Sequence, residues 1–205
     1  MVDQGPVGGD RRRADELIAM LKQAAIDLLA KHRNGAISVT TMQAAAPWHF
    51  AGQTSAFHVE ASACMGSAAS LGLGIALGAP GRKVMVLDGD GSLLMQLGSL
   101  VTVAGAAPEN YYHFVFANGL YESSGNQPLP GSGASDLVAL AKAAGYAEAV
   151  RFANTDDCDR ALPGVFATRG PGVVEIEIAR DDATPRWAGV PMAEMVLKLK
   201  SDLGG

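Results

Sequence analysis

One stretch of the chain, residues 84–130, restricts most strongly the folds that this sequence can adopt. It begins with VMVLDGDGSLLMQLGSL and ends with FVFANGLYESSGNQPLP. Residues 84–87 are apolar and predict a buried strand, which is followed by Asp88-Gly89-Asp90-Gly91 and by a helical pattern from Ser92. Residues 111–116 predict a second buried strand. A strand, a helix and a strand in this order predict a parallel crossover unit.

Asp90 and Asn118 follow the two predicted strands and are 118 − 90 = 28 positions apart. Parallel neighbouring strands would place them together at the carboxyl edge of the sheet, where open α/β folds bind ligands. A carboxylate and an amide oxygen are suitable ligands for a hard cation such as Mg²⁺. Gly91 and Ser92 open the predicted helix, whose N–H groups and dipole would attract a phosphate. Because Gly89 and Gly91 let a ligand approach the backbone closely, the pattern predicts a magnesium-diphosphate site.

These residues also match a known motif. Gly89-Asp90-Gly91 followed by Asn118-Gly119 resembles the thiamine-diphosphate motif, in which GDG is followed one crossover later by NN. The closest resemblance is to the diphosphate-binding half of the small 2-oxo-acid decarboxylases that act on sulfopyruvate and phosphonopyruvate. Two further blocks, residues 65–70 (MGSAAS) and 121–128 (YESSGNQP), resemble runs that these enzymes carry before the GDG and after the Asn. The likeness covers roughly residues 37–178.

The resemblance implies two cofactors, thiamine diphosphate and Mg²⁺, and a set of residues that bind them. Asp90, the Asn118 side chain and the backbone carbonyl of Leu120 would bind the metal. Met65 would be an apolar wedge that bends the cofactor, and the Ala63 carbonyl would accept a hydrogen bond from the aminopyrimidine. The cofactor-binding residues on this mapping are Thr41, Ala63, Met65, Gly89, Gly91, Ser92, Asn118 and Leu120. The loop that follows would contact the substrate through Tyr121, Glu122, Ser123, Ser124 and Gln127.

Residues 40–47 depart most from the resemblance. The relatives have Thr-Thr-Gly-x-Thr-Ser-Arg-Glu here, and this chain has Thr40-Thr41-Met42-Gln43-Ala44-Ala45-Ala46-Pro47. The glycine, a hydroxyl and the arginine are therefore lost, so only Thr41 is carried over as a cofactor contact. The substrate can accordingly differ from those of the relatives.

The rest of the chain alternates helical and strand patterns, which predicts an α/β fold: a single three-layer domain with a mostly parallel sheet and helices on both faces. We expect a disordered tail over residues 1–10 and the diphosphate-binding domain over residues 11–205. Ser135 is the expected N-cap of one helix. Glu175 and Glu177 alternate with apolar residues and predict an edge strand with one solvated face. The further predicted helices are 13–32, 66–77, 135–144, 155–168 and 191–199, and the further predicted strands are 36–41, 56–60, 147–152 and 173–178.

Composition excludes several classes of protein. The net charge is −5, from 16 basic and 21 acidic residues, without a basic stripe, which argues against a nucleic-acid partner. No apolar run reaches the ~20 residues of a membrane span. The N-terminus has no apolar signal-peptide core, and two cysteines are too few for a disulfide framework. We therefore expect a cytoplasmic protein.

Several motifs have simpler explanations. Asp-Gly and Asn-Gly are common turn dipeptides, so Asp90 and Asn118 alone could be turn residues, and Met65 alone could be a core methionine. The glycines at 72, 74 and 78 do not have the spacing of a dinucleotide fingerprint, and the Asp88 region lacks the glycine and glutamate of a calcium loop. His58 and His113 lie in apolar segments and are expected to be core or edge histidines.

The resemblance implies a decarboxylase that is incomplete on its own. In the family, the cofactor is activated by a glutamate from a separate pyrimidine-binding domain, and no residue of this chain matches it. We therefore expect a beta subunit that works with an unlike alpha subunit in a hetero-oligomer, converting a small anionic 2-oxo acid to CO₂ and an aldehyde. The alternatives are a carboligase subunit of the acetolactate-synthase type and a catalytically silent scaffold that holds the cofactor.

Overall fold

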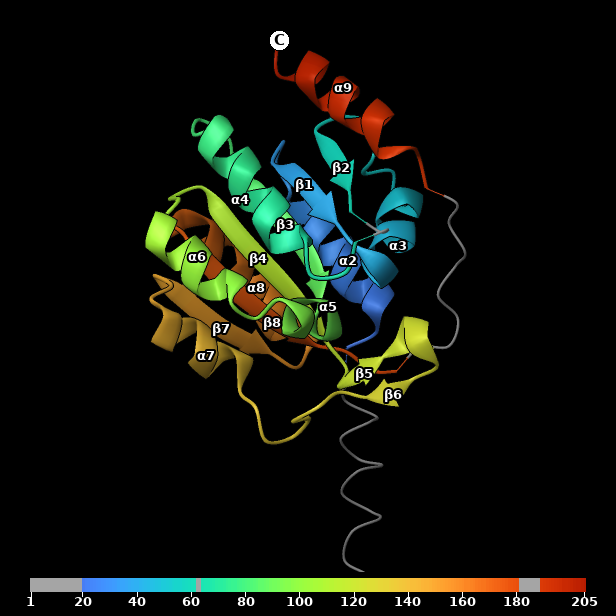
Figure 1. Ribbon diagram of the computed structural model, residues 1–205, viewed down its shortest axis with the longest axis vertical. Helices are drawn as coiled ribbons and strands as arrows, with labels where there is room; N and C mark the ends of the chain where they lie inside the picture. Colours follow the sequence, from blue (N-terminus) through green and yellow to red (C-terminus); the bar gives the residue numbers. More distant parts are fainter. Residues whose placement is uncertain (1–19, 62–63, 181–188) are drawn as a thin grey trace, which may run out of the picture.

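The computed structural model describes residues 20–61, 64–180 and 189–205. They form one six-stranded sheet with helices on both faces, so the predicted three-layer α/β architecture is confirmed (Figure 1). The expected tail over residues 1–10 lies outside the described residues, as does the start of the helix predicted at 13–32. The boundary between tail and domain therefore stays a prediction. None of the helices described is long and apolar enough to cross a membrane.

The six strands are all parallel and follow the order β2-β1-β3-β4-β8-β7. The central strand β4 is almost continuously apolar and buried on both faces, as the middle of a parallel sheet requires. A separate antiparallel pair, β5 with β6, projects beyond the carboxyl edge of the sheet (Figure 1). The strands are β1 (Ile37–Thr40), β2 (His58–Glu60), β3 (Val84–Gly89), β4 (Tyr111–Ala117), β5 (Leu120–Tyr121), β6 (Gln127–Pro128), β7 (Glu148–Phe152) and β8 (Gly172–Glu177).

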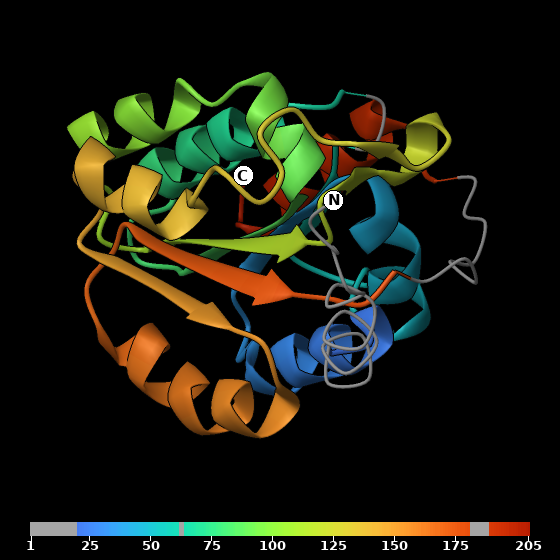
Figure 2. The same ribbon diagram turned by 90° about the horizontal axis from the view of Figure 1, so that it is seen from below.

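The helices divide between the two faces of the sheet, as Figure 2 shows from below. Alternate residues of β3 separate the two cores: Met85 and Leu87 pack with the layer that contains α2, α3 and α8. Val84 and Val86 pack with the layer that contains α4, α6, α7 and α9. The helices are α2 (Lys22–His32), η1 (Met42–Ala44), α3 (Ala45–Phe50), α4 (Ala68–Gly78), α5 (Asp90–Met95), α6 (Ser99–Ala106), η2 (Glu122–Ser124), α7 (Leu137–Ala144), α8 (Thr155–Ala167) and α9 (Met192–Asp202).

Two local predictions were wrong. The strand that contains Glu175 is not an edge strand, because β8 lies between β4 and β7. Glu175 is only 7% exposed and accepts a 3.0 Å hydrogen bond from Nε of Arg151, so an ion pair accounts for the charge within the strand. The N-cap of α7 is Asp136 and not Ser135: its Oδ1 accepts the N–H of Ala139 at 3.0 Å. A carboxylate at this position also complements the helix dipole.

Candidate active site

The ends of β3 and β4 bring Asp90 and Asn118 together, as their spacing predicts. The two strands are parallel neighbours, with Gly89 in register with Phe116. One carboxylate oxygen of Asp90, Oδ2, accepts the backbone N–H groups of Asn118 at 3.0 Å and of Gly119 at 2.7 Å. The crossover prediction is therefore confirmed at the level of individual atoms.

Asp90 is buried at this junction, with only 7% of its surface exposed. Its second oxygen, Oδ1, accepts the N–H of Gly91 at 2.8 Å. Burial raises the pKa of Asp90, and the hydrogen bonds from Gly119, Gly91 and Asn118 oppose this rise. The neighbouring Glu122 carboxylate adds a further, smaller upward contribution to the pKa of Asp90. A positive charge placed beside Asp90 would offset both of the unfavourable effects on its ionised form.

A cleft at this edge of the sheet encloses about 470 Å³, including its open mouth. Most of the site residues that the sequence predicts line this cleft, although they come from segments as far apart in sequence as residues 41 and 123. The predicted residues that line it are Thr41, Met65, Gly89, Asp90, Gly91, Ser92, Asn118, Leu120, Tyr121, Glu122 and Ser123. Ser124 and Gln127 do not line it and are exposed on η2 and β6, and Ala63 lies outside the described residues.

The two glycines around Asp90 have different surroundings. A Cβ atom on Gly91 would lie 2.7 Å from Cδ1 of Tyr121, so the close approach of this ring requires glycine. A Cβ atom on Gly89 would meet nothing within 4 Å, so the backbone there borders open space in the cleft. The sequence predicts that both glycines leave room for a ligand. The open space beside Gly89 agrees with this prediction, whereas the ring of Tyr121 fills the space beside Gly91.

The strand β3 ends at Gly89, and the short helix α5 begins at the next residue, Asp90, two residues before the predicted start. The Ser92 hydroxyl accepts the backbone N–H of Gly66 at 3.0 Å and so fixes the turn that follows Met65. The N–H of Gly91, one of the groups expected to bind a phosphate, already donates to Asp90. The role of Gly91 and Ser92 in phosphate binding stays a prediction.

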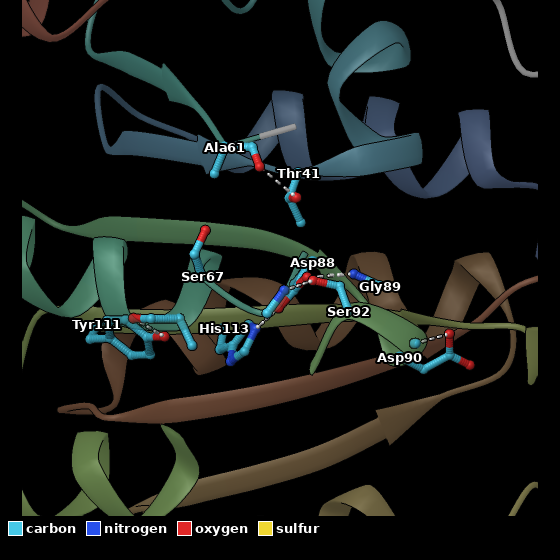
Figure 3. A network of polar contacts seen from close by, with 12 residues as sticks. Thr41, Ala61, Ser67, Asp88, Gly89, Asp90, Ser92, Tyr111 and His113 are labelled. Atoms are coloured by element: carbon cyan, nitrogen blue, oxygen red, sulfur yellow. Dashed lines mark hydrogen bonds and ion pairs between the residues drawn. The ribbon is translucent and has the colours of Figure 1, made fainter. Parts of the chain in front are cut away.

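The altered segment after β1 has two notable features, a hydrogen bond from Thr41 and a left-handed residue, Met42. The Thr41 hydroxyl donates to the carbonyl of Ala61 at 3.1 Å, which ties the end of β1 to the chain leaving β2 (Figure 3). Met42 has a φ of 48°, in the left-handed region that favours glycine. This is the position at which the resembling enzymes carry glycine, the residue that adopts such a conformation without strain.

Sequence patterns missed Lys22, which also lines the cleft. Its Nζ donates to Oε2 of Glu122 at 2.8 Å, and both side chains are almost completely buried. Lys22 opens α2, an amphipathic helix on which a lysine is normally solvated, and it lies 100 positions from its partner. No local pattern could have indicated this contact.

The histidines lie away from the cleft. His113 is fully buried, and its Nε2 lies 3.1 Å from Oδ2 of Asp88, a pair that supports β3 directly below Asp90 (Figure 3). His58 lies on β2 and bonds the hydroxyl of Ser38 through Nδ1 at 3.0 Å. Both therefore occupy the core positions expected from the sequence.

A parallel α/β sheet with a buried carboxylate between two strand ends and an adjoining cleft defines a ligand-binding domain of the kind used for diphosphate cofactors. Residues 36–176 match the family model described as "Thiamine pyrophosphate enzyme, C-terminal TPP binding domain". The chain belongs to this family, so the cofactor class that the sequence predicts is confirmed.

Comparisons with individual proteins show which members of the family this chain is similar to. The chain is 49% identical over 114 residues to a phosphonopyruvate decarboxylase of Streptomyces hygroscopicus, a match that covers 56% of this chain and 28% of the relative. It is 37% identical over 131 residues to the sulfopyruvate decarboxylase subunit beta of Methanothermobacter thermautotrophicus, covering 64% of each. A solved 4-hydroxybenzoylformate decarboxylase of Rhodococcus jostii has the same fold, with a TM-score of 0.66 at 19% identity over 81% of this chain and 34% of that one. The chain thus spans between about a quarter and two thirds of the length of these relatives.

Proposed function

We propose that this chain is the beta subunit of a thiamine-diphosphate- and Mg²⁺-dependent decarboxylase of a small anionic 2-oxo acid. The substrate resembles sulfopyruvate or phosphonopyruvate, and the products are CO₂ and an aldehyde. The observation that carries the proposal is the junction of Asp90 with Asn118 and Gly119 beside an open cleft. The identities to decarboxylases of these two acids support the substrate class.

The residues at the junction fit a magnesium ion. Asp90 is a buried carboxylate whose ionised form a cation would stabilise, and the Asn118 amide oxygen and the Leu120 carbonyl are further oxygen ligands of the kind Mg²⁺ takes. Among the described residues, no three His, Cys, Asp or Glu side chains form a metal site. The proposed donor set is one carboxylate with neutral oxygens, which suits an ion that also binds diphosphate oxygens and water.

The cleft also fits the cofactor. The open space beside Gly89 would admit the diphosphate, and Met65 lines the same cleft and would support the rings. When bound, thiamine diphosphate supplies the electron sink that allows CO₂ to leave a 2-oxo acid. This chain would hold the metal through Asp90, position the cofactor with Met65, and exclude water with Tyr121 and Glu122. The proton that activates the cofactor would come from a glutamate of the alpha subunit.

The partner is part of the proposal. Three relatives named subunit beta match this chain over 43% to 67% of their own length. The proposed subunit would contribute the metal and diphosphate site, with an unlike chain contributing the pyrimidine site. We expect the isolated chain to bind the cofactor without turning over a 2-oxo acid.

The experiment is to purify the tagged chain from its native host together with any chain that binds it, and then to supply thiamine diphosphate and Mg²⁺. We expect an unlike chain to be recovered, and the complex to release CO₂ and an aldehyde from sulfopyruvate or phosphonopyruvate. A hydroxyketone product would identify a carboligase instead, and failure to bind the cofactor would identify a silent scaffold. Rapid decarboxylation by the single chain would disprove the requirement for a partner.

A further inference from the structure

The wall of the cleft contains a buried ion pair whose charges have no role in the function proposed above. Lys22, the first residue of α2, donates from Nζ to Oε2 of Glu122 in η2 at 2.8 Å. Their side chains are only 3% and 10% exposed. Both residues line the same cleft as Asp90 and Asn118, so the pair borders the space where we expect cofactor and substrate to bind.

Stability alone gives little reason for this pair. Removing two charges from water costs free energy that their attraction does not reliably repay, so an apolar pair of similar volume would usually serve a core as well. In addition, Oε1 of Glu122 is buried, and within the part of the chain that the structure describes it has no hydrogen-bond donor. A buried acceptor without a donor is unfavourable, so this oxygen also gives the pair no advantage in stability.

The charges around the cleft single out Lys22. Among the described residues that line it, the acidic side chains are Asp88, Asp90 and Glu122, and Lys22 is the one basic side chain. Asp88 is held by His113, and Asp90 accepts backbone N–H groups. The segment Met42–Ala44, which contacts η2 and also lines the cleft, has no charged residue. Within the described lining, an anionic substrate that enters the cleft therefore meets one cationic group, the Lys22 ammonium.

We infer that Lys22 recognises the anionic end of the substrate and thereby selects acids with a charged tail over acids with an uncharged one. This inference rests on the proposed function, because it concerns the substrate of the same cleft. Glu122 keeps the ammonium oriented and electrically balanced while the cleft is empty. On binding, a sulfonate or phosphonate oxygen shares or replaces the Glu122 carboxylate as acceptor.

The chemistry of lysine suits such an exchange. Its ammonium has three N–H donors on a flexible stem and acts as a point charge that can accept a tetrahedral anion from several directions. Truncating one partner of a buried charge pair typically costs a large factor in binding, whereas an uncharged tail gains nothing from the ammonium. Selectivity would thus come from the difference between the two tails.

The test compares charged and uncharged tails on the cofactor-loaded complex of this chain with its partner. The main variant is Lys22→Met with Glu122→Gln, which removes both charges of this pair together. The first control, Lys22→Arg, keeps the charge. The second, Lys31→Met, removes an exposed lysine of the same helix, which is paired with Asp159 of α8. We expect the double variant to lower the ratio of kcat/KM for phosphonopyruvate to that for pyruvate by about 100-fold, mainly through KM, with the ratio preserved in the other two variants.

A second measurement does not depend on turnover. Phosphonoacetate, which has no 2-oxo group, and propionate are titrated calorimetrically into the same complexes. The expected result is a roughly 100-fold weaker affinity for phosphonoacetate in the double variant and in no other. Equal losses for charged and uncharged ligands, or an unchanged affinity for phosphonoacetate, would overturn the inference and leave Lys22 as a tether for η2. If the wild-type complex decarboxylates none of the acids, the proposed function fails, and the titration still decides the role of Lys22.

Discussion

The backbone N–H of Gly119 donates a 2.7 Å hydrogen bond to Oδ2 of Asp90, which joins the loop after β4 to the end of β3. With the bonds from Asn118 and Gly91, this contact fixes the carboxylate through backbone groups of the protein. The side chain that we propose as the principal metal ligand is therefore oriented by the fold itself. A ligand that is positioned in advance loses less conformational entropy on binding.

The first prediction concerns this carboxylate. Asp90→Asn retains the side-chain shape and removes the charge, so we expect Mg²⁺-dependent binding of thiamine diphosphate to weaken by at least about 100-fold. The control is Asp27→Asn, an exposed carboxylate on α2 that bonds Gln23. Calorimetric titration of the cofactor with and without Mg²⁺ measures the effect. Equal affinities of the two variants would contradict the proposed metal site.

Sequence patterns predicted the elements that depend on short-range information. The apolar run before Asp90 and its distance from Asn118 were sufficient to predict that two parallel strands bring these residues together. The helix predicted over residues 155–168 is α8, which runs from Thr155 to Ala167. In these cases the residues that determine the structure are close in sequence or belong to one crossover.

The predictions that failed depend on contacts between distant segments. The alternating pattern predicts a solvent-facing Glu175, because the sequence does not show that Arg151 on the neighbouring strand β7 lies beside it. The pair of Lys22 with Glu122 joins residues 100 positions apart and has no local signature. The α7 cap was misplaced by one residue, because Ser135 and Asp136 are both good N-caps and the chain geometry decides between them.

The second prediction concerns two glycines of α4. A Cβ atom on Gly72 would lie 2.3 Å from Cγ2 of Val86, because the helix packs directly on β3, whereas one on Gly74 would meet nothing within 4 Å. Gly72→Ala should lower the free energy of unfolding by about 1–3 kcal/mol through overpacking. Gly74→Ala should raise it by about 0.5–1 kcal/mol, since alanine favours a helix interior. Urea unfolding of the isolated chain measures both, and a loss of stability in both variants would contradict the packing argument.

The third prediction concerns the left-handed backbone at Met42, whose φ is 48°. Met42→Gly and Met42→Ala remove the same side chain, but only glycine adopts this conformation without strain. We expect the glycine variant to be more stable than the alanine variant by about 0.5–1 kcal/mol, the reverse of the usual order. Chemical denaturation of the two variants under identical conditions gives the difference. Greater stability of the alanine variant would show that the turn relaxes away from the left-handed region.

The last prediction concerns His58 and acid stability. His58 is 6% exposed, and its pKa is lowered to about 3, mainly by burial and also by the nearby Arg33 and His49, while the hydrogen bond with Ser38 opposes this shift. Its pKa in the folded state is thus below the ~6.5 of an unfolded chain, so the unfolded state binds one more proton between these values. The contribution of His58 to the free energy of unfolding is therefore fully present above about pH 6.5. It falls by about 1.4 kcal/mol per pH unit as the pH drops toward 3.

His58→Asn removes this titration and keeps a polar atom near Ser38. Between about pH 6.5 and pH 4.5 we expect the wild-type chain to lose about 2–3 kcal/mol more of its unfolding free energy than the variant loses. Urea unfolding at several pH values, with the slopes of the transitions compared, measures the difference and cancels the titration of the remaining carboxylates. Parallel pH profiles for the two proteins would show that His58 is protonated in the folded state or that the strand β2 opens in acid, because either event removes the difference in bound protons between the folded and unfolded chains.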